Sequence, residues 1–436
     1  MTHAETLSRP LSLPCGAILP NRLAKAAMTE GLADGTNTAN ARFETLYRRW
    51  GAGGAGLLIT GNVQIDRWHL ERAGNIAIEG QQGRAATDAL ARMASAAKAH
   101  GSKVIMQLSH AGRQTQKMIN PTPMAPSNVP LAIKGRFGIP IPMSEAQIDA
   151  AIAGFVNAAQ VARDTGFDGV QIHAAHGYLI SQFLSPLSNR RRDGWGGDLP
   201  GRARFLLDVV KQVRATCPAP FILSVKLNSA DFQTGGFSEE DSARVAAWLA
   251  AAGCDLLEVS GGNYEQPRMF DFERKDPLAS TRRASTMARE AYFLNFVPKL
   301  RAASADLPIM VTGGFRSAEA MASALRRDGI DVIGLARPLI LDPNAARALL
   351  DGTRDRLDSL DAPQPLGPGL FGPASPISAL RDLNGWATVG WQFEQIYALA
   401  DGRDPNLSLS ALRALLAYDK TEKRAARALV RDPIKE

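Results

Sequence analysis

The sequence predicts a (β/α)8 barrel of the TIM type, with a short N-terminal hairpin and a C-terminal helical extension. Eight short apolar runs alternate with eight longer amphipathic segments. The short runs are apolar on consecutive positions, which is typical of strands covered on both faces of a parallel sheet. Polar residues follow the same end of every run, where barrels of this type place their active sites. A doubly wound open sheet is the second candidate, but no GxGxxG motif follows an early run.

The eight strands are expected where the apolar runs lie, at residues 22–28, 56–60, 103–108, 169–172, 221–227, 255–260, 308–312 and 331–336. Two of the helices between them have clear boundaries. The segment 144–166 begins with Ser144 as N-cap and stops at Gly166, and 238–253 begins with Ser238 and stops at Gly253. Further helices are expected at about 40–52, 83–100, 201–215, 287–303, 317–328 and 344–351.

The barrel domain is expected to span residues 1–351. Its first part, 1–21, contains three prolines and is predicted to form a hairpin or plug over the barrel floor. Residues 352–436 begin with a Pro/Gly-rich linker and continue with helical stretches such as WQFEQIYALADG. We expect this extension to pack on the barrel or on a neighbouring subunit.

Composition excludes several classes of protein. Among 436 residues 45% are hydrophobic and 21% charged, which describes a globular chain. The net charge of +7 is dispersed and accompanies no nucleic-acid-binding motif, so no nucleic acid partner is expected. The N-terminus lacks the apolar core of a signal peptide, and no apolar stretch approaches the length of about 20 residues that a membrane helix needs. We expect a cytoplasmic protein without a membrane partner, and leave a homo-oligomer open.

The three cysteines are far apart and match no metal-binding spacing. Cys15, Cys217 and Cys254 are therefore expected to be unpaired thiols in a reducing compartment.

A phosphate site is predicted where the seventh and eighth strands end. Gly313 and Gly314 leave backbone N–H groups unobstructed, and a helix begins at about Ser317. Arg337, after the eighth strand, adds a guanidinium group. Backbone amides, a helix N-terminus and an arginine together suit a phosphate. An ordinary strand-to-helix turn is the alternative interpretation of the two glycines.

The fourth strand ends with His173, His176 and Tyr178. Two imidazoles and a phenol can bind a metal, pack in the core, or handle a substrate's oxygen and proton. The spacing of three between the histidines, the missing HExxH glutamate and the absence of a nearby cysteine argue against a metal. No metal is expected, while packing and substrate handling both stay open.

Four segments in the same order resemble the Old Yellow Enzyme family of FMN-dependent oxidoreductases. They are QLSHAGRQ at 107–114, GFDGVQIHAAHGYLISQFLSPLSNRRRDGWGGDLPGRARF at 166–205, TGGFRS at 312–317 and GLARPLILDP at 334–343. The resemblance covers roughly residues 8–345. It implies the same barrel, bound FMN, and NADPH or NADH as the reductant.

The resemblance also implies which residues bind FMN. Thr29 would touch the flavin O4 edge, and Gly61 would let the backbone lie close to the ring. Gln107 would hydrogen-bond the pyrimidine edge, and Lys226 would sit near N1 and O2. The phosphate would be held by the residues that follow strands seven and eight, namely Gly313, Gly314, Ala336 and Arg337.

For the reaction, the resemblance implies reduction of an activated alkene, most often an α,β-unsaturated carbonyl compound. His173 and His176 would hydrogen-bond the substrate oxygen and stabilise the enolate that forms. Tyr178 would give a proton to Cα. The cycle would be ping-pong, with both substrates using one site.

Three features depart from the family pattern. Lys226 replaces a frequent arginine, Ala336 replaces a usual glycine, and Thr29 and the His-x-x-His pair belong to different branches. No cysteine follows the barrel, so an iron–sulfur cluster is not expected. Two alternative functions remain: a flavin-dependent dehydrogenase or redox-neutral isomerase on the same barrel, and a flavin- or phosphate-binding barrel without turnover. Trp68 and Tyr264 are candidates for shaping the substrate pocket.

Overall fold

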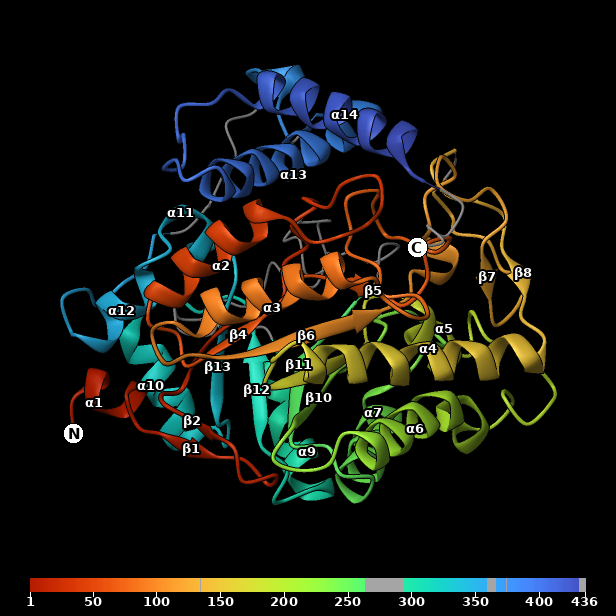
Figure 1. The fold of residues 1–436 in the computed structure, drawn as a ribbon, viewed down its shortest axis with the longest axis horizontal. Coiled ribbons are helices and arrows are strands. Elements are labelled where there is room, and N and C mark those ends of the chain that lie inside the picture. The colour runs from red at the N-terminus through yellow and green to blue at the C-terminus, as the bar shows by residue number, and fades with distance from the viewer. Residues whose placement is uncertain (134, 263–292, 359–365, 374, 431–436) are drawn as a thin grey trace.

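The computed structural model describes residues 1–133, 135–262, 293–358, 366–373 and 375–430. Its centre is a closed barrel of eight parallel strands (Figure 1). In chain order these are β3 (Leu23–Lys25), β4 (Leu57–Ile59), β6 (Lys103–Ser109), β9 (Gly169–Ala174), β10 (Ile222–Asn228), β11 (Leu256–Ser260), β12 (Ile309–Thr312) and β13 (Val332–Leu335). The last strand, β13, pairs with the first, β3, and β4 pairs with β6, so the sheet has no open edge. The predicted barrel is confirmed, and the open doubly wound sheet is wrong.

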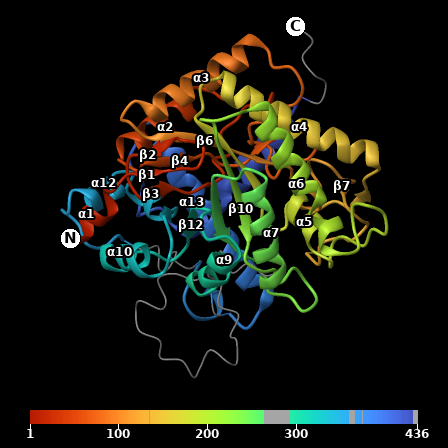
Figure 2. The same ribbon diagram turned by 90° about the horizontal axis from the view of Figure 1, so that it is seen from below.

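Helices surround the strands (Figure 2). The helices that follow successive strands are α2 (Ala41–Ala52), α3 (Arg84–Lys98), α4 (Glu145–Asp164), α6 (Leu199–Thr216), α7 (Glu239–Ala251), α9 (Val297–Ala303), α10 (Ala318–Arg327) and α12 (Ala345–Leu350). Ser144 and Ser238 cap α4 and α7 by accepting backbone N–H groups, as the sequence predicts. Of the helix expected at 287–303, residues 287–292 lie outside the described residues.

Several short elements lie outside the eight barrel strands and their helices, and the sequence did not predict them individually. They are α5 (Leu179–Leu184), α11 (Pro338–Leu341), β5 (Val63–Gln64), β7 (Met124–Ala125), β8 (Ile141–Pro142), η1 (Gly112–Gln114), η4 (Leu294–Phe296) and η5 (Gly369–Phe371). The most consequential is α5, because it starts directly after Tyr178 and fixes where that residue's backbone lies.

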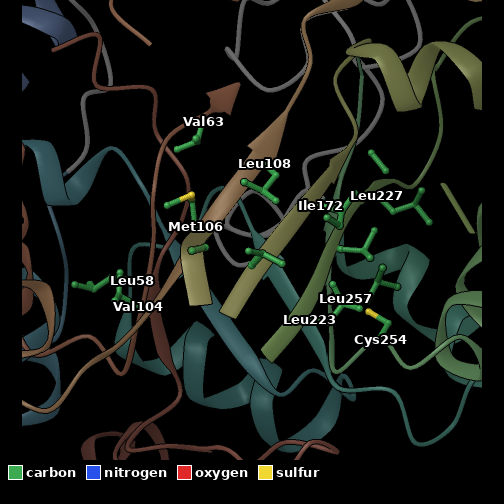
Figure 3. Packing of buried hydrophobic residues seen from close by; sticks show 14 of the residues in the cluster. Leu58, Val63, Val104, Met106, Leu108, Ile172, Leu223, Leu227, Cys254 and Leu257 are labelled. Carbon is green, nitrogen blue, oxygen red and sulfur yellow. The ribbon is translucent and has the colours of Figure 1, made fainter. Parts of the chain in front are cut away.

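The core has two layers. The outer layer lies between strands and helices and includes Val104, Met106 and Leu108 of β6 (Figure 3). The inner layer fills the barrel with side chains such as Ile105 and Met310. At the N-terminal end α1 (His3–Leu7) precedes an antiparallel hairpin of β1 (Leu11–Ser12) and β2 (Ile18–Leu19). This hairpin adds Leu13, Ala17 and Leu19 to the inner layer, so it covers the barrel floor.

The C-terminal extension consists of α13 (Ser378–Ala400) and α14 (Ala411–Ala428), which pack against each other. In Figure 1 this blue pair lies above α2, and α13 contacts both α2 and α11. The ion pair between Arg42 of α2 and Asp401 joins the extension to the barrel's helices at 2.7 Å. Among the described residues no helix combines the length and the hydropathy that crossing a membrane would require.

Lys25 on β3 is a fully buried cation between the barrel and α2. Its ammonium group donates to the carbonyl oxygens of Ala26 and Ile59, at 3.1 and 2.6 Å, and lies 4.4 Å from the centroid of the Trp50 ring. Burial lowers the pKa of Lys25 to about 8 from its ordinary 10.5. The unfolded chain therefore binds more protons than the native chain between these two values, and stability rises with pH across that window.

We predict that Lys25→Met removes this pH dependence. Relative to the variant, the wild-type protein should gain about 3 kcal/mol of unfolding free energy between pH 8 and pH 10.5, since each pKa unit corresponds to about 1.4 kcal/mol. Urea unfolding at several pH values measures the difference, with Lys420→Met on exposed α14 as the control. A constant difference between wild type and Lys25→Met would show that Lys25 does not titrate there.

Candidate active site

Barrel closure brings the polar residues of neighbouring strands to the same level. In the register of the sheet Lys226 of β10 pairs with His173 of β9 on one side and with Glu258 of β11 on the other. Residues paired in this way point to the same face of a sheet. The candidate site is therefore built on β9, β10 and β11, near the ends from which their loops leave.

The three predicted residues of strand four lie together. The His173 ring centroid is 5.0 Å from that of His176 and 4.8 Å from that of Tyr178, with both pairs edge to face. The backbone of His176 has a φ of 61°, which is uncommon for a residue other than glycine. Its N–H donates to Asn228 Oδ1 at 3.1 Å, which holds this turn in place. All three side chains are buried.

Both imidazoles are neutral near pH 7. Burial, with repulsion from Lys226, lowers the pKa of His173 and of His176 well below the usual value. Nδ1 of His173 accepts the Ala175 N–H at 3.2 Å, so the proton of this neutral ring is on Nε2. Nε2 of His176 lies 2.6 Å from Ser260 Oγ. Neutral imidazoles of this kind can donate a hydrogen bond to an oxygen without bringing a full charge.

A buried polar layer adjoins the histidines and is centred on Glu258. The carboxylate has no exposed surface, and its Oε1 lies 3.0 Å from the Lys226 ammonium, which is 5% exposed. Gln171 donates to Oε2 at 2.9 Å, and Thr312 donates to Oε1 at 2.7 Å. Gln107 in turn donates to Gln171 at 2.7 Å. Two predicted cofactor residues, Gln107 and Lys226, thus belong to one hydrogen-bonded network.

Glu258 was not singled out in the sequence, although a signal was present. It stands in the run DLLEVS at 255–260, an apolar strand predicted to be covered on both faces. A carboxylate in such a strand needs partners, because an isolated buried charge is very costly. The partners could not be named from the sequence, since Lys226, Gln171 and Thr312 come from three other strands.

Thr29 and Gly61 lie where the loops of the first two barrel strands begin. The Thr29 hydroxyl donates to Glu71 Oε2 at 2.7 Å, and Asn62 Nδ2 donates to the same oxygen at 2.6 Å. A Cβ added at Gly61 would lie 2.3 Å from Glu30 Oε2 and 2.4 Å from the Met28 carbonyl oxygen. The protein's own packing therefore demands glycine at position 61, whatever else lies beside it.

The predicted phosphate residues follow two neighbouring strands. Thr312 of β12 pairs with Gly334 of β13, so Gly313 and Gly314 leave the sheet beside Ala336 and Arg337. The two glycines have φ angles of 130° and 80°, a region that favours glycine. Arg337 is half-buried and directly precedes α11. After the glycine turn, Ser317 caps α10.

One cluster of metal-ligating side chains occurs in the described part of the chain, formed by Asp66, His69 and His110. In both imidazoles one ring nitrogen already accepts a hydrogen bond from a backbone N–H group. His69 Nε2 accepts the Met124 N–H at 2.9 Å, and His110 Nδ1 accepts the Gly112 N–H at 3.0 Å. The remaining nitrogens carry hydrogens and face Asp66, at 2.7 and 3.8 Å. The cluster ties the loops after β5 and β6 together and has no free lone pair on its histidines for a metal.

Two residues were expected to shape the substrate pocket. Trp68 is 45% exposed, and Tyr264 lies outside the described residues.

The chain forms a closed parallel barrel with buried polar residues at one mouth. The family model of the NADH:flavin oxidoreductase / NADH oxidase family matches residues 7–355, so the chain belongs to this family. The chain is 36% identical over 357 residues to "NADH-dependent flavin oxidoreductase iliE" of Hypocrea jecorina, a match that covers 77% of this chain and 86% of that protein.

Solved structures agree with this assignment. A 2-naphthoyl-CoA reductase complex superimposes with a TM-score of 0.72 at 25% identity, covering 80% of this chain and 52% of that one. The old yellow enzyme homologue of Zymomonas mobilis has a TM-score of 0.65 at 23% identity, covers 81% of this chain and 95% of its own, and supports the fold. The resemblance to Old Yellow Enzymes is confirmed.

FMN is the cofactor of this family. The observed residues fit it: Gln107 and Lys226 offer buried donors to a flavin edge, while Gly313, Gly314 and Arg337 offer a glycine turn and a cation to a phosphate. The extension after residue 355 lies outside the family match.

We predict that Glu258→Gln destabilises the protein by about 3–5 kcal/mol, because it leaves the Lys226 ammonium buried without its counter-charge. The double variant Lys226→Met/Glu258→Gln should recover most of this loss, since it removes both charges. Guanidinium unfolding measures both. Asp419→Asn, which breaks an exposed pair with Lys423 on α14, is the control. Equal losses in the single and double variants would contradict a direct coupling.

Proposed function

We propose that this protein is an FMN-dependent ene-reductase that reduces the C=C bond of an α,β-unsaturated carbonyl compound. The observation that carries the proposal is the group of His173, His176 and Tyr178, buried side by side at the barrel mouth. Two neutral imidazoles can donate hydrogen bonds to one carbonyl oxygen, and one phenol can supply one proton. A binding barrel without turnover would leave this combination unexplained.

In this proposal the chain's own residues polarise the substrate and supply a proton. His173, through its Nε2–H, and His176 donate hydrogen bonds to the carbonyl oxygen. These bonds withdraw electron density from Cβ and stabilise the negative charge that develops on the oxygen. Tyr178 holds the proton that Cα receives, because a phenol can act as a general acid beside a developing carbanion. FMN, when bound, supplies the hydride for Cβ.

The same proposal assigns the cofactor residues. Gln107 and Lys226 bind the pyrimidine edge of the flavin, with Thr29 and Gly61 beside its carbonyl edge and ring. The phosphate is held by the residues that follow β12 and β13, namely Gly313, Gly314, Ala336 and Arg337. Pairing with Glu258 reduces the effective positive charge that Lys226 presents, so this flavin environment is less cationic than one built on an unpaired arginine.

We propose NADH as the reductant, because the relative from Hypocrea jecorina is named as NADH-dependent. Reductant and alkene would use the same mouth in turn, which gives ping-pong kinetics.

The purified protein should be yellow and should oxidise NADH when a cyclic enone is added. Tyr178→Phe should reduce alkene-dependent reoxidation by roughly 10²–10⁴-fold, the usual contribution of a general acid, while reduction by NADH is unchanged. Anaerobic stopped-flow spectroscopy separates the two half-reactions. Asp419→Asn on α14 is the control, since this residue makes an exposed ion pair with Lys423 on the same helix.

Several outcomes would overturn the proposal. Unchanged alkene turnover in Tyr178→Phe would remove this residue as the proton donor. A colourless protein that cannot be reconstituted with FMN would refute the proposal of an FMN-dependent enzyme. Anaerobic product analysis separates ene-reduction from amine dehydrogenation and from redox-neutral isomerisation, which leave different products.

A further inference from the structure

Residues of the C-terminal extension bind Arg72, which lies in the barrel's second loop. The guanidinium Nη2 and Nε donate to the Glu422 carboxylate of α14, at 2.6 and 3.2 Å. Nη2 also donates to the Tyr397 hydroxyl of α13 at 3.1 Å, and the guanidinium carbon lies 3.5 Å from the centroid of the Phe393 ring. Arg72 is 3% exposed and Glu422 is 6% exposed. A bidentate pair buried to this degree holds its partners in one geometry.

Arg72 is also anchored within the barrel. Its backbone N–H donates to Asn75 Oδ1 at 2.7 Å. A Cβ added at Gly31 would lie 2.8 Å from the guanidinium carbon, so the loop after β3 closely approaches this side chain. The guanidinium therefore spans from the extension to the loops that follow the first and second barrel strands.

The preceding residue, Glu71, connects Arg72 to the candidate site. Glu71 Oε2 accepts hydrogen bonds from Thr29 and from Asn62, as described above. The Glu71 carbonyl oxygen accepts from Gln116 Nε2 at 3.1 Å. Because Arg72 follows Glu71 directly, holding the arginine also restricts where the Glu71 carboxylate lies.

This arrangement determines what Thr29 offers to a ligand. A threonine hydroxyl has one hydrogen, and here Thr29 donates it to Glu71. As long as it does so, Thr29 presents lone pairs rather than a donor to the flavin O4 edge proposed beside it. A donor at that carbonyl would stabilise the electron-rich reduced flavin, and a carboxylate nearby would destabilise it.

We propose that Glu422 is a positioning residue of the flavin site: through Arg72 it holds Glu71 as the acceptor of the Thr29 hydroxyl and thereby keeps the midpoint potential of bound FMN low. The extension that follows the family match is then part of the cofactor environment. This inference rests on the proposed placement of FMN with its O4 edge at Thr29.

A purely structural role for the same ion pair would act differently. The extension has other attachments to the same loops: Ala425, Ala426 and Leu429 pack on a small apolar cluster that includes Leu70 and Ala73. The Val430 N–H also donates to the Gly35 carbonyl oxygen at 2.8 Å. These contacts should keep the extension in place when the ion pair is weakened, so the isosteric variant Glu422→Gln should fold.

The test is a double-mutant cycle read out by the midpoint potential of bound FMN in the holoenzyme, without any alkene. Glu422→Gln should free the Thr29 hydroxyl and stabilise reduced over oxidised FMN by about tenfold, which is ~30 mV for a two-electron couple. Glu71→Gln should shift the potential in the same direction. In the Glu71→Gln background the change at Glu422 should add nothing, because its effect passes through Glu71.

Asp401→Asn is the matched control, since it weakens an ion pair of the same extension with α2. It should leave the potential unchanged. A lower unfolding temperature in Glu422→Gln without a shift in potential would overturn the proposal. So would a shift that persists in the Glu71→Gln background, because it would reflect the charge of Arg72 acting directly.

If Glu422→Gln does not fold, Tyr397→Phe replaces it. This change removes one hydrogen bond to Arg72 and keeps the ion pair, so a smaller shift in the same direction is expected and no shift overturns the proposal. The readout needs bound FMN but no alkene turnover. A wild-type protein that binds FMN and fails to reduce enones would therefore refute the proposed function while leaving this test valid.

Discussion

The buried ion pair between Lys226 and Glu258 is the interaction on which the site depends. A carboxylate without exposed surface must be matched by donors, and Lys226, Gln171 and Thr312 converge on it from three other strands. Gln107 joins through Gln171. The barrel can bring these partners together only because its sheet is closed and its strands are in one register. One charge in an otherwise apolar strand thus organises the interior beneath the mouth.

The same cation shapes the chemistry above it. Lys226 lies one strand from His173, and together with burial it keeps both imidazoles uncharged. Neutral donors can bind a carbonyl oxygen and still gain strength when that oxygen becomes negative. Glu258 balances the lysine, so this buried pair carries little net charge. The three polar groups of strand four and the layer below them therefore form one electrostatic unit.

The extension lies outside the family match and contacts the barrel's second loop through Arg72. Arg72 is enclosed by Glu422, Tyr397 and Phe393, all from α13 and α14. The neighbouring Glu71 holds Thr29 and Asn62 at the mouth. A segment that looks like a peripheral helical pair thus holds Arg72, the residue that follows Glu71 in the chain. The family match covers residues 7–355, and Phe393, Tyr397 and Glu422 lie beyond it.

The sequence by itself determined the alternating strands and helices and predicted the barrel, because strand burial, helix caps and turn glycines are local properties. The runs of consecutive apolar residues, Ser144, Ser238 and the Gly313–Gly314 turn each encode structure within a few residues. The strand-four motif likewise placed His173, His176 and Tyr178 together. Only the tertiary structure revealed Glu258, Glu71 and the pair of Arg72 with Glu422. Their partners stand 32, 42 and 350 residues away in the chain. No local pattern encodes such pairs, because chain folding and barrel closure alone decide which distant charges meet.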